Sequence, residues 1–282
     1  MISFLKRKII LSIKLIWCFF LTGNSLNAQF FNVPFTILDS ATIKVTYTLN
    51  WKEDTNNLKQ ERSEKMILLA GEDKRMFMGK NFYELYIIGR KAESEGKLQS
   101  FFDRNEMQNY STRFSYRILK NYPKGYYTYY DKVIPDYLQY SESFSVFKWE
   151  LLNETDSIRE YPVQKARCIY GGREWIAWYT SSIPINDGPY KFQGLPGLIV
   201  KIHDSKEHYT FELDEIERYE EYLYVEFEDR GWINTTRENF LKAERSLKLD
   251  IVNRAKEAGA NTVSQQRAYR NMLKKNNPIE LE

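Results

Sequence analysis

The sequence contains few of the residues that form cross-links or bind metals. Among its 282 residues there are two cysteines and two histidines. Cys18 lies in an N-terminal apolar run, and if that run is removed Cys168 has no partner for an internal disulfide. His203 and His208 alone fall short of the ligand set of a typical zinc site. We therefore expect no disulfide, no metal site and no cofactor.

An excess of charge of one sign is also missing. The chain has 41 Lys and Arg against 38 Asp and Glu, a net charge of +3, which excludes a nucleic-acid binder driven by bulk charge. The sequence has no phosphate-binding glycine loop, no serine nucleophile elbow and no H-E-x-x-H zinc motif. Hydrophobic residues make up 43% and charged residues 28%, a balance typical of globular proteins. We expect a folded protein without chemistry of its own, rather than an enzyme.

Residues 1–28 have the features of a secretory signal peptide. Basic residues at positions 6–8 precede an apolar run at 9–21, and the small Ala28 suits the position before cleavage. An uncleaved membrane anchor is the alternative, but the run is short and Lys14 interrupts it. We therefore predict a periplasmic or secreted protein that has no membrane span after cleavage. The 254 residues that remain carry a net charge of −1, because the segment holds four basic residues and no acids.

Most of residues 29–260 alternates with the period of two that is typical of half-buried strands. Ile43, Val45 and Tyr47 alternate with polar neighbours. We find no internal repeat and no linker that would divide this region. The pattern predicts one mainly β (α+β) domain over 29–260, a single curved antiparallel sheet resembling a half-barrel. The polar segment 261–282 is expected to be a flexible tail.

Two hairpins can be given a register. Gly171-Gly172 forms a two-residue turn that places Tyr170 opposite Arg173 and Cys168 opposite Trp175. Around the loop 204–207, His203 is expected opposite His208, with Ile202 opposite Tyr209 and Val200 opposite Phe211. In both hairpins one face is then mostly apolar, as expected for a sheet with one covered face.

Helical patterns are fewer. Residues 81–97 carry a loose apolar stripe. Residues 236–258 carry a clearer one, which begins with Phe240 and Ala243. Thr235 and Glu238 have the spacing of a capping box. We expect one or two helices packed on the sheet, including this C-terminal one.

The segment 183–199 stands out because three glycines and three prolines lie between two strands. Pro196 and Gly197 suit the central positions of a type II turn, since proline presets φ and glycine adopts positive φ. Gly194 precedes them in the same turn motif. The connection is long for a compact antiparallel sheet and its large residues are aromatic or apolar, so it must pack on its own domain or on a partner.

The same residues resemble a known family. The run 194–199, Gly-Leu-Pro-Gly-Leu-Ile, matches the motif of the GLPGLI family of exported proteins. The resemblance extends upstream over 172–180 and 183–189 and downstream into 209–213. The family has no established activity, so the resemblance implies an envelope or secreted protein and supplies no catalytic residues. The strand order is also similar to the half-barrel of lipoprotein carriers, whose curved sheet can hold an acyl chain or an apolar peptide.

Aromatic residues near this loop are the candidate binding residues. They either fill the core or line an apolar cleft used by a ligand or partner. The candidates are Trp175, Trp178, Tyr179, Tyr190, Phe192 and Leu195.

We therefore predict an exported binding or interaction module that holds an apolar ligand or client peptide on the concave face of the sheet. One alternative is a structural or accessory partner of an outer-membrane complex, with an unknown envelope protein as its partner. The other is a carboxylate-based hydrolase, which would need two buried acids with shifted pKa values in one cleft.

Overall fold

The computed structural model describes residues 33–103, 106–257 and 263–281. The predicted signal peptide, residues 1–28, lies outside the described residues, so cleavage and export stay predictions. Within the described residues, no helix combines the length and the apolar character needed to cross a bilayer. The elements, in chain order, are β1 Phe35–Trp51, β2 Arg62–Gly71, β3 Arg75–Gly79, α3 Lys80–Ser94, α4 Leu98–Asp103, η1 Glu106–Tyr110, β4 Arg117–Lys120, β5 Tyr126–Val133, β6 Asp136–Ser143, η2 Phe144–Val146, β7 Glu150–Ile158, β8 Tyr161–Tyr170, β9 Arg173–Thr180, β10 Leu198–Asp204, β11 Tyr209–Glu228, β12 Ile233–Asn234, α5 Arg237–Glu257 and α6 Val263–Leu273.

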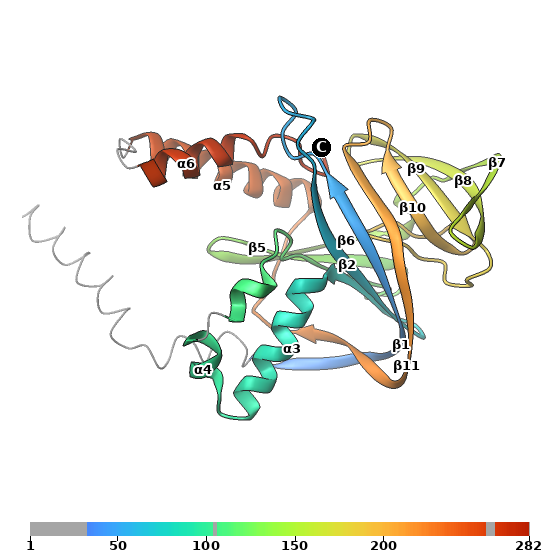
Figure 1. The fold of residues 1–282 in the computed structure, drawn as a ribbon, viewed down its shortest axis with the longest axis horizontal. Coiled ribbons are helices and arrows are strands. Elements are labelled where there is room, and N and C mark those ends of the chain that lie inside the picture. Colours follow the sequence, from blue (N-terminus) through green and yellow to red (C-terminus); the bar gives the residue numbers. More distant parts are fainter. Residues whose placement is uncertain (1–32, 104–105, 258–262, 282) are drawn as a thin grey trace, which may run out of the picture.

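The fold is mainly β, as predicted, and its strands form one open sheet. Within the described residues this sheet has twelve strands, in the order β12-β6-β5-β4-β3-β2-β1-β11-β10-β9-β8-β7. Neighbours pair antiparallel, except for the short parallel pair β12 and β6. The long strands β1 and β11 run through the middle of the molecule (Figure 1). Their pairing is interrupted by three register shifts, which are the kind of irregularity that bends a strand.

The sheet has apolar side chains on both faces, because alternate residues of its central strands are buried on opposite sides. The larger core lies under α5, where Phe240 and the half-buried Leu247 pack. The smaller core on the other face includes Ile67 and Leu69 of β2, and Phe82 of α3 packs against it. Figure 1 shows α5 and α6 together on one side of the central strands and α3 near the opposite end of those strands. Both predicted helices therefore exist and cover different parts of the sheet.

The register of the first hairpin is confirmed. Tyr170 pairs with Arg173 and Cys168 with Trp175. Both turn glycines have positive φ, 59° at Gly171 and 71° at Gly172, as a type I′ turn requires. The alternation of buried residues and the turn residues therefore predicted the same pairing.

The register predicted for the second hairpin is wrong by two residues. His203 lies opposite Thr210, and Ile202 lies opposite Phe211. The cause is the side chain of Asp204, whose Oδ1 accepts hydrogen bonds from the backbone N–H groups of His208 (2.7 Å) and Tyr209 (2.8 Å). The loop is therefore two residues longer than the polar run 204–207 indicates. A shift of two residues keeps the apolar residues on one face, since the side-chain period of a strand is two.

The predicted cap of α5 is corrected by one residue. The Oγ1 atom of Thr236, not of Thr235, accepts the backbone N–H of Asn239 at 3.2 Å. The backbone N–H of Thr235 donates instead to the carbonyl of Gln139 at 2.8 Å, which continues the pairing of β12 with β6. The helix therefore starts after the chain has left the sheet.

The expected flexible tail, 261–282, differs most from the structure. Its first part contains α6, and residues 276–281 then return to the sheet. We call residues 276–281 the C-terminal strap. The strap is fastened by backbone groups: Leu281 N–H donates to the carbonyl of Gly171 at 2.8 Å, and Asn276 N–H to that of Glu53 at 3.1 Å. Polar composition suggested flexibility, but the polar groups of this segment are used inside the fold.

Candidate functional site

The glycine–proline loop is part of the protein interior. Asp187 and Lys191 each have 0% of their surface exposed, although both are charged residue types. Buried charges are expensive unless they are paired. Each has a partner from a distant part of the chain, and these two ion pairs fix the loop.

The first ion pair joins the loop to β4. The ammonium group of Lys120 lies 2.5 Å from Asp187 Oδ1. It also donates to the carbonyls of Gly188 (2.9 Å) and Phe192 (3.2 Å). One lysine therefore satisfies a carboxylate and two backbone oxygens in a place that water does not reach.

The second ion pair joins the loop to the C-terminal strap. Lys191 donates to the carboxylate of Glu280, which also accepts from Arg237 at 2.6 Å and from the hydroxyl of Tyr190. Burial raises the pKa of Glu280, but the charges of Lys191 and Arg237 outweigh it and hold that pKa below its ordinary value. The Lys191 ammonium lies 4.6–5.6 Å from the ring centroids of Tyr127, Tyr129, Tyr140, Tyr170 and Tyr190. We call this group of Lys191, Glu280 and Arg237 the clasp. The sequence analysis missed it because Lys191 and Glu280 are far apart in the chain.

The predicted turn is present but of another type. The N–H of Gly197 donates to the carbonyl of Leu195 at 2.8 Å, and the N–H of Leu198 donates across to Ile183 at 3.2 Å. Pro196 is thus at the centre of a three-residue γ-turn instead of a type II turn, because the fourth residue is bonded elsewhere. The positive φ expected at Gly197 is found, at 139°, and Gly194 has φ 92°.

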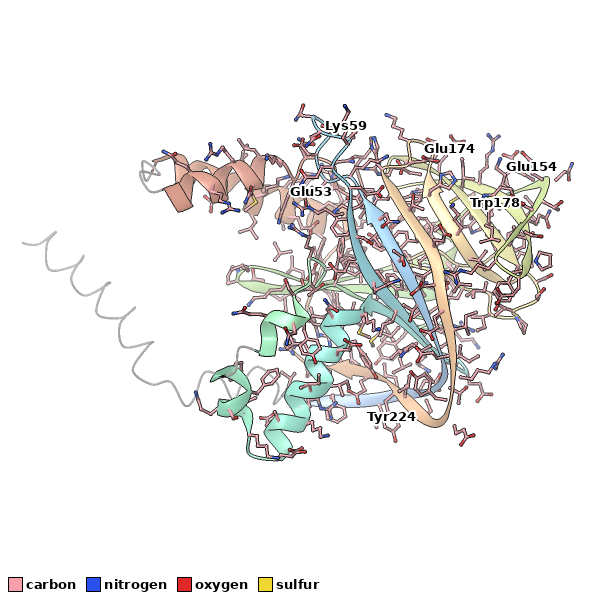
Figure 2. The ribbon with its side chains drawn as sticks, viewed as in Figure 1. Glu53, Lys59, Glu154, Glu174, Trp178 and Tyr224 are labelled. Atoms are coloured by element: carbon pink, nitrogen blue, oxygen red, sulfur yellow. The ribbon has the colours of Figure 1, made fainter. Side chains whose placement is uncertain are left out.

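Most of the predicted binding residues lie in the core. Trp175, Tyr179, Phe192 and Leu195 are all buried, and Phe192 packs against the ring of Trp175 at 4.7 Å between centroids. Trp178 is half-buried, with the Lys165 ammonium 5.6 Å from its ring. Figure 2 shows Trp178 among β7–β10, well away from Glu53, a residue that lines the cavity described next.

Two of the six candidates line a cavity: Tyr179 borders an open pocket between β7, β8 and β9, and Tyr190 reaches a separate cavity. This cavity, of about 350 Å³, lies between the sheet, α5 and the C-terminal strap. Its size falls within the range of about 300–1,000 Å³ that is usual for small-molecule sites. Aromatic side chains form much of its wall: Trp51, Phe114, Tyr116, Tyr129, Tyr140, Tyr190, Tyr209 and Phe240. We call it the aromatic cavity.

Two of the four acidic residues that line this cavity have raised pKa values. Asp131 follows Tyr129 by two residues on the same face of β5, and Glu244 follows Phe240 by four residues on α5. The rings of Tyr129 and Phe240 are 5.3 Å apart between centroids. Burial raises the pKa of Asp131 to about 6. Glu244 is an exposed residue, yet loss of water around its carboxyl and the charges of Asp131 and Glu280 raise its pKa to about 7. The two acids are therefore electrostatically coupled.

Tyr116 adds a polar group without a partner. This residue lines the aromatic cavity, and its hydroxyl is buried and makes no hydrogen bond with the described residues. Buried hydroxyls normally have a partner. The cavity therefore combines aromatic walls with a few polar groups, which is the usual make-up of a ligand site.

The two histidines lie at the hairpin that joins β10 and β11. Within the described residues, no three His, Cys, Asp or Glu side chains are grouped as metal ligands would be. His203 Nδ1 is 3.1 Å from the backbone oxygen of Asp204. The Cys168 thiol is buried, and this burial raises its pKa to about 12, so it is a poor nucleophile.

Comparison with known proteins finds one family model that matches part of the chain. Residues 172–201 match the model of a family described as "Protein of unknown function (Porph_ging)". These residues comprise β9, the glycine–proline loop and the start of β10. No curated protein matches the chain.

Solved structures match the fold. The chain is similar to one described as "Structure of PNGF-II in P21 space group", with a TM-score of 0.50 and 12% identity over 74% of this chain. A second structure, "PNGF-II in C2 space group", has a TM-score of 0.49 and 12% identity over 74% of this chain. The match covers 34% of the first solved chain and 33% of the second, so this chain spans about a third of their length. At this identity the first likeness shows a shared β-rich fold.

Proposed function

We propose that this protein is an exported binding module that holds a small, mainly apolar molecule in the aromatic cavity. The observation that carries the proposal is the cavity itself. It lies between the sheet and α5, and its walls are aromatic side chains with a few polar groups among them. Aromatic rings supply large apolar contact area. On this account the sheet works as a half-barrel around the ligand, and α5 and the C-terminal strap close the site.

A small molecule fits this site better than a client polypeptide. The C-terminal strap forms one wall, and Arg173 fixes it by donating to the carbonyls of Pro278 (2.6 Å) and Ile279 (2.9 Å). The hydroxyl of Tyr209 also donates to the carbonyl of Asn277 at 2.6 Å. An extended peptide would need a groove open at both ends, which would require the strap to leave its partners.

Filling the cavity is expected to block binding. Leu241 of α5 is half-buried and lines the cavity, whereas Leu249 of the same helix is 61% exposed and does not. We expect Leu241→Trp to weaken binding of naphthylethanol, an uncharged aromatic probe, by at least about tenfold, or 1.4 kcal/mol. Leu249→Trp should leave the affinity unchanged. Calorimetric titration compares the two variants with the parent, provided that all three have the same melting temperature. Equal affinities for all three proteins would refute the aromatic cavity as the binding site.

The carboxyl pair favours a second candidate, a carboxylate-based hydrolase. Asp131 and Glu244 have pKa values near neutrality and share one cavity, so one could give a proton while the other takes one. Hydrolysis of glycosides uses such a pair. A panel of nitrophenyl glycosides tests this candidate, which requires Asp131→Asn and Glu244→Gln each to abolish any activity that the parent shows.

The coupling of the pair can be measured without any substrate. Because the charge of Asp131 raises the pKa of Glu244, we expect Asp131→Asn to lower that pKa from about 7 toward its ordinary value. Titration of the side-chain carboxyl carbon by NMR, on protein labelled at glutamate, reports this directly. An unchanged pKa of Glu244 in the variant would mean that the two acids do not interact.

The proposed export and the likeness to the GLPGLI family are compatible with this role. The family-model match spans the segment that carries the Gly-Leu-Pro-Gly-Leu-Ile run. The role of accessory partner in an outer-membrane complex stays a prediction. Two residues that the sequence analysis named for partner binding, Tyr190 and Phe192, are buried and so give it no support.

A further inference from the structure

Four of the residues that line the aromatic cavity are basic, and since three of them are exposed we call this part of the cavity its mouth. Arg245 and Lys248 of α5 line it, and so do Lys275, which follows α6, and Arg113. Lys248 is half-buried and Lys275 exposed. Because these cations come from three separate segments, the fold and not a local run of basic residues brings them together.

The two lysines of this group, Lys248 and Lys275, form no ion pair with the described residues. Burial lowers the pKa of Lys248, and the charge of Lys275 lowers it further, so the two ammonium groups repel each other. Arg113, by contrast, lies 3.4 Å from Glu53. Within the described residues, the two lysines at the mouth are therefore without a salt-bridge partner.

The acids that line the cavity cannot fully compensate this charge. Glu53 is paired with Arg62 at 2.5 Å as well as with Arg113. Glu280 is buried in its clasp with Lys191 and Arg237. Glu244 attracts Lys248, but with a pKa of about 7 it is only partly ionised at neutral pH. Asp131, with a pKa of about 6, is mostly ionised at neutral pH, but the charges that shift the pKa of Lys248 are those of Lys275 and Glu244 and not that of Asp131.

We infer that the ligand of the aromatic cavity is an amphipathic anion, whose charged end binds between Lys248 and Lys275 and whose apolar body lies against Tyr129 and Phe240. The inference rests on the proposed function and names the chemical class of its ligand. An anion would relieve the repulsion between the two lysines, and charge-assisted hydrogen bonds are the stronger kind. The rings of Tyr129 and Phe240, in contact with each other, form the apolar surface next to this charge.

Three probes with the same ring system test the inference: naphthylacetate, naphthylethanol and naphthylethylamine, which are anionic, neutral and cationic. We expect the parent to bind naphthylacetate most tightly, by about tenfold over naphthylethanol. The double variant Lys248→Gln/Lys275→Gln should lose that advantage and bind naphthylethanol as before. Lys274→Gln is the matched control, because Lys274 is the exposed neighbour of Lys275 and does not line the cavity; it should behave like the parent.

Each other outcome contradicts a defined part of the account. Equal affinities for the anionic and neutral probes, or a preference for the amine, would overturn the inference and leave the proposed function standing. An anion preference that survives in the double variant would overturn the assignment to these lysines. Inorganic phosphate that binds as tightly as naphthylacetate would show an ion site without an apolar body. Failure of all three probes to bind would overturn the proposed function as well.

Discussion

Replacing Lys120 with methionine is expected to lower the free energy of unfolding by about 3–5 kcal/mol, the cost of removing one partner of a buried ion pair. Lys120 is fully buried, and its ammonium group is bonded to Asp187 and to the carbonyls of Gly188 and Phe192. Methionine fills a similar volume but cannot donate. Asp187 would keep Arg75 at 3.7 Å, and two carbonyls would lose a donor inside the core.

Urea unfolding measures this loss, and two further variants make it specific. Lys124 is exposed in the turn that follows β4, so Lys124→Met should change stability by less than about 0.5 kcal/mol. The double variant Lys120→Met/Asp187→Asn should lose less than the sum of its single changes, since the two groups act on each other. A Lys120→Met protein as stable as Lys124→Met would show that this pair does not hold the loop.

Alanine at Gly197 is expected to be about as damaging, with a loss of about 3 kcal/mol or more. A Cβ atom built there would lie 2.0 Å from the carbonyl oxygen of Thr180 and 2.9 Å from the Cα of Ser181. Both are backbone atoms, so no side-chain movement can relieve the overlap. The φ of 139° adds strain, because L-residues rarely adopt it.

Gly194 separates the two causes. Its φ is also positive, 92°, but a Cβ atom built there meets nothing within 4 Å. Gly194→Ala should therefore cost only the conformational strain, about 1–2 kcal/mol. If thermal or urea unfolding gave equal losses for both variants, the close approach of the loop to the end of β9 would not be what requires glycine at position 197.

The sequence predicted the parts of the fold that depend on local patterns. Alternation along the strands and the Gly171-Gly172 turn gave the correct pairing of Tyr170 with Arg173, because two glycines and one apolar face leave a single register. The pairing after β10 could not be obtained in this way. It depends on the carboxylate of Asp204 bonding to two backbone N–H groups, and a hydrophobic pattern contains no information on such bonds.

The candidate site was predictable only in part. Tyr190 was among the expected residues, but Asp131 and Glu244 were not, since they meet only when α5 packs across β5. Signals were nevertheless present: Asp131 continues the alternation of Tyr127 and Tyr129, and Glu244 follows Phe240 by one helical turn. An acid in line with a buried stripe is a feature that would have pointed to the cavity.

The C-terminal strap shows why composition alone fails. Residues 276–281 include Asn277 and Glu280, which are both 4% exposed. Their partners are Arg173 of β9 at 2.7 Å and Lys191 of the loop. A polar segment is expected to be flexible unless its polar groups have buried partners elsewhere in the fold. The sequence alone does not show which distant residues supply those partners.

The most direct test of the account is a crystal structure of the full chain grown with a bromonaphthylacetate, in which the anomalous scattering of bromine locates the ring. The account predicts a bromine peak inside the aromatic cavity, near Tyr129 and Phe240, with the carboxylate between Lys248 and Lys275. A cavity that holds only water while the probe lies elsewhere on the surface, or no bound probe at all, would contradict it.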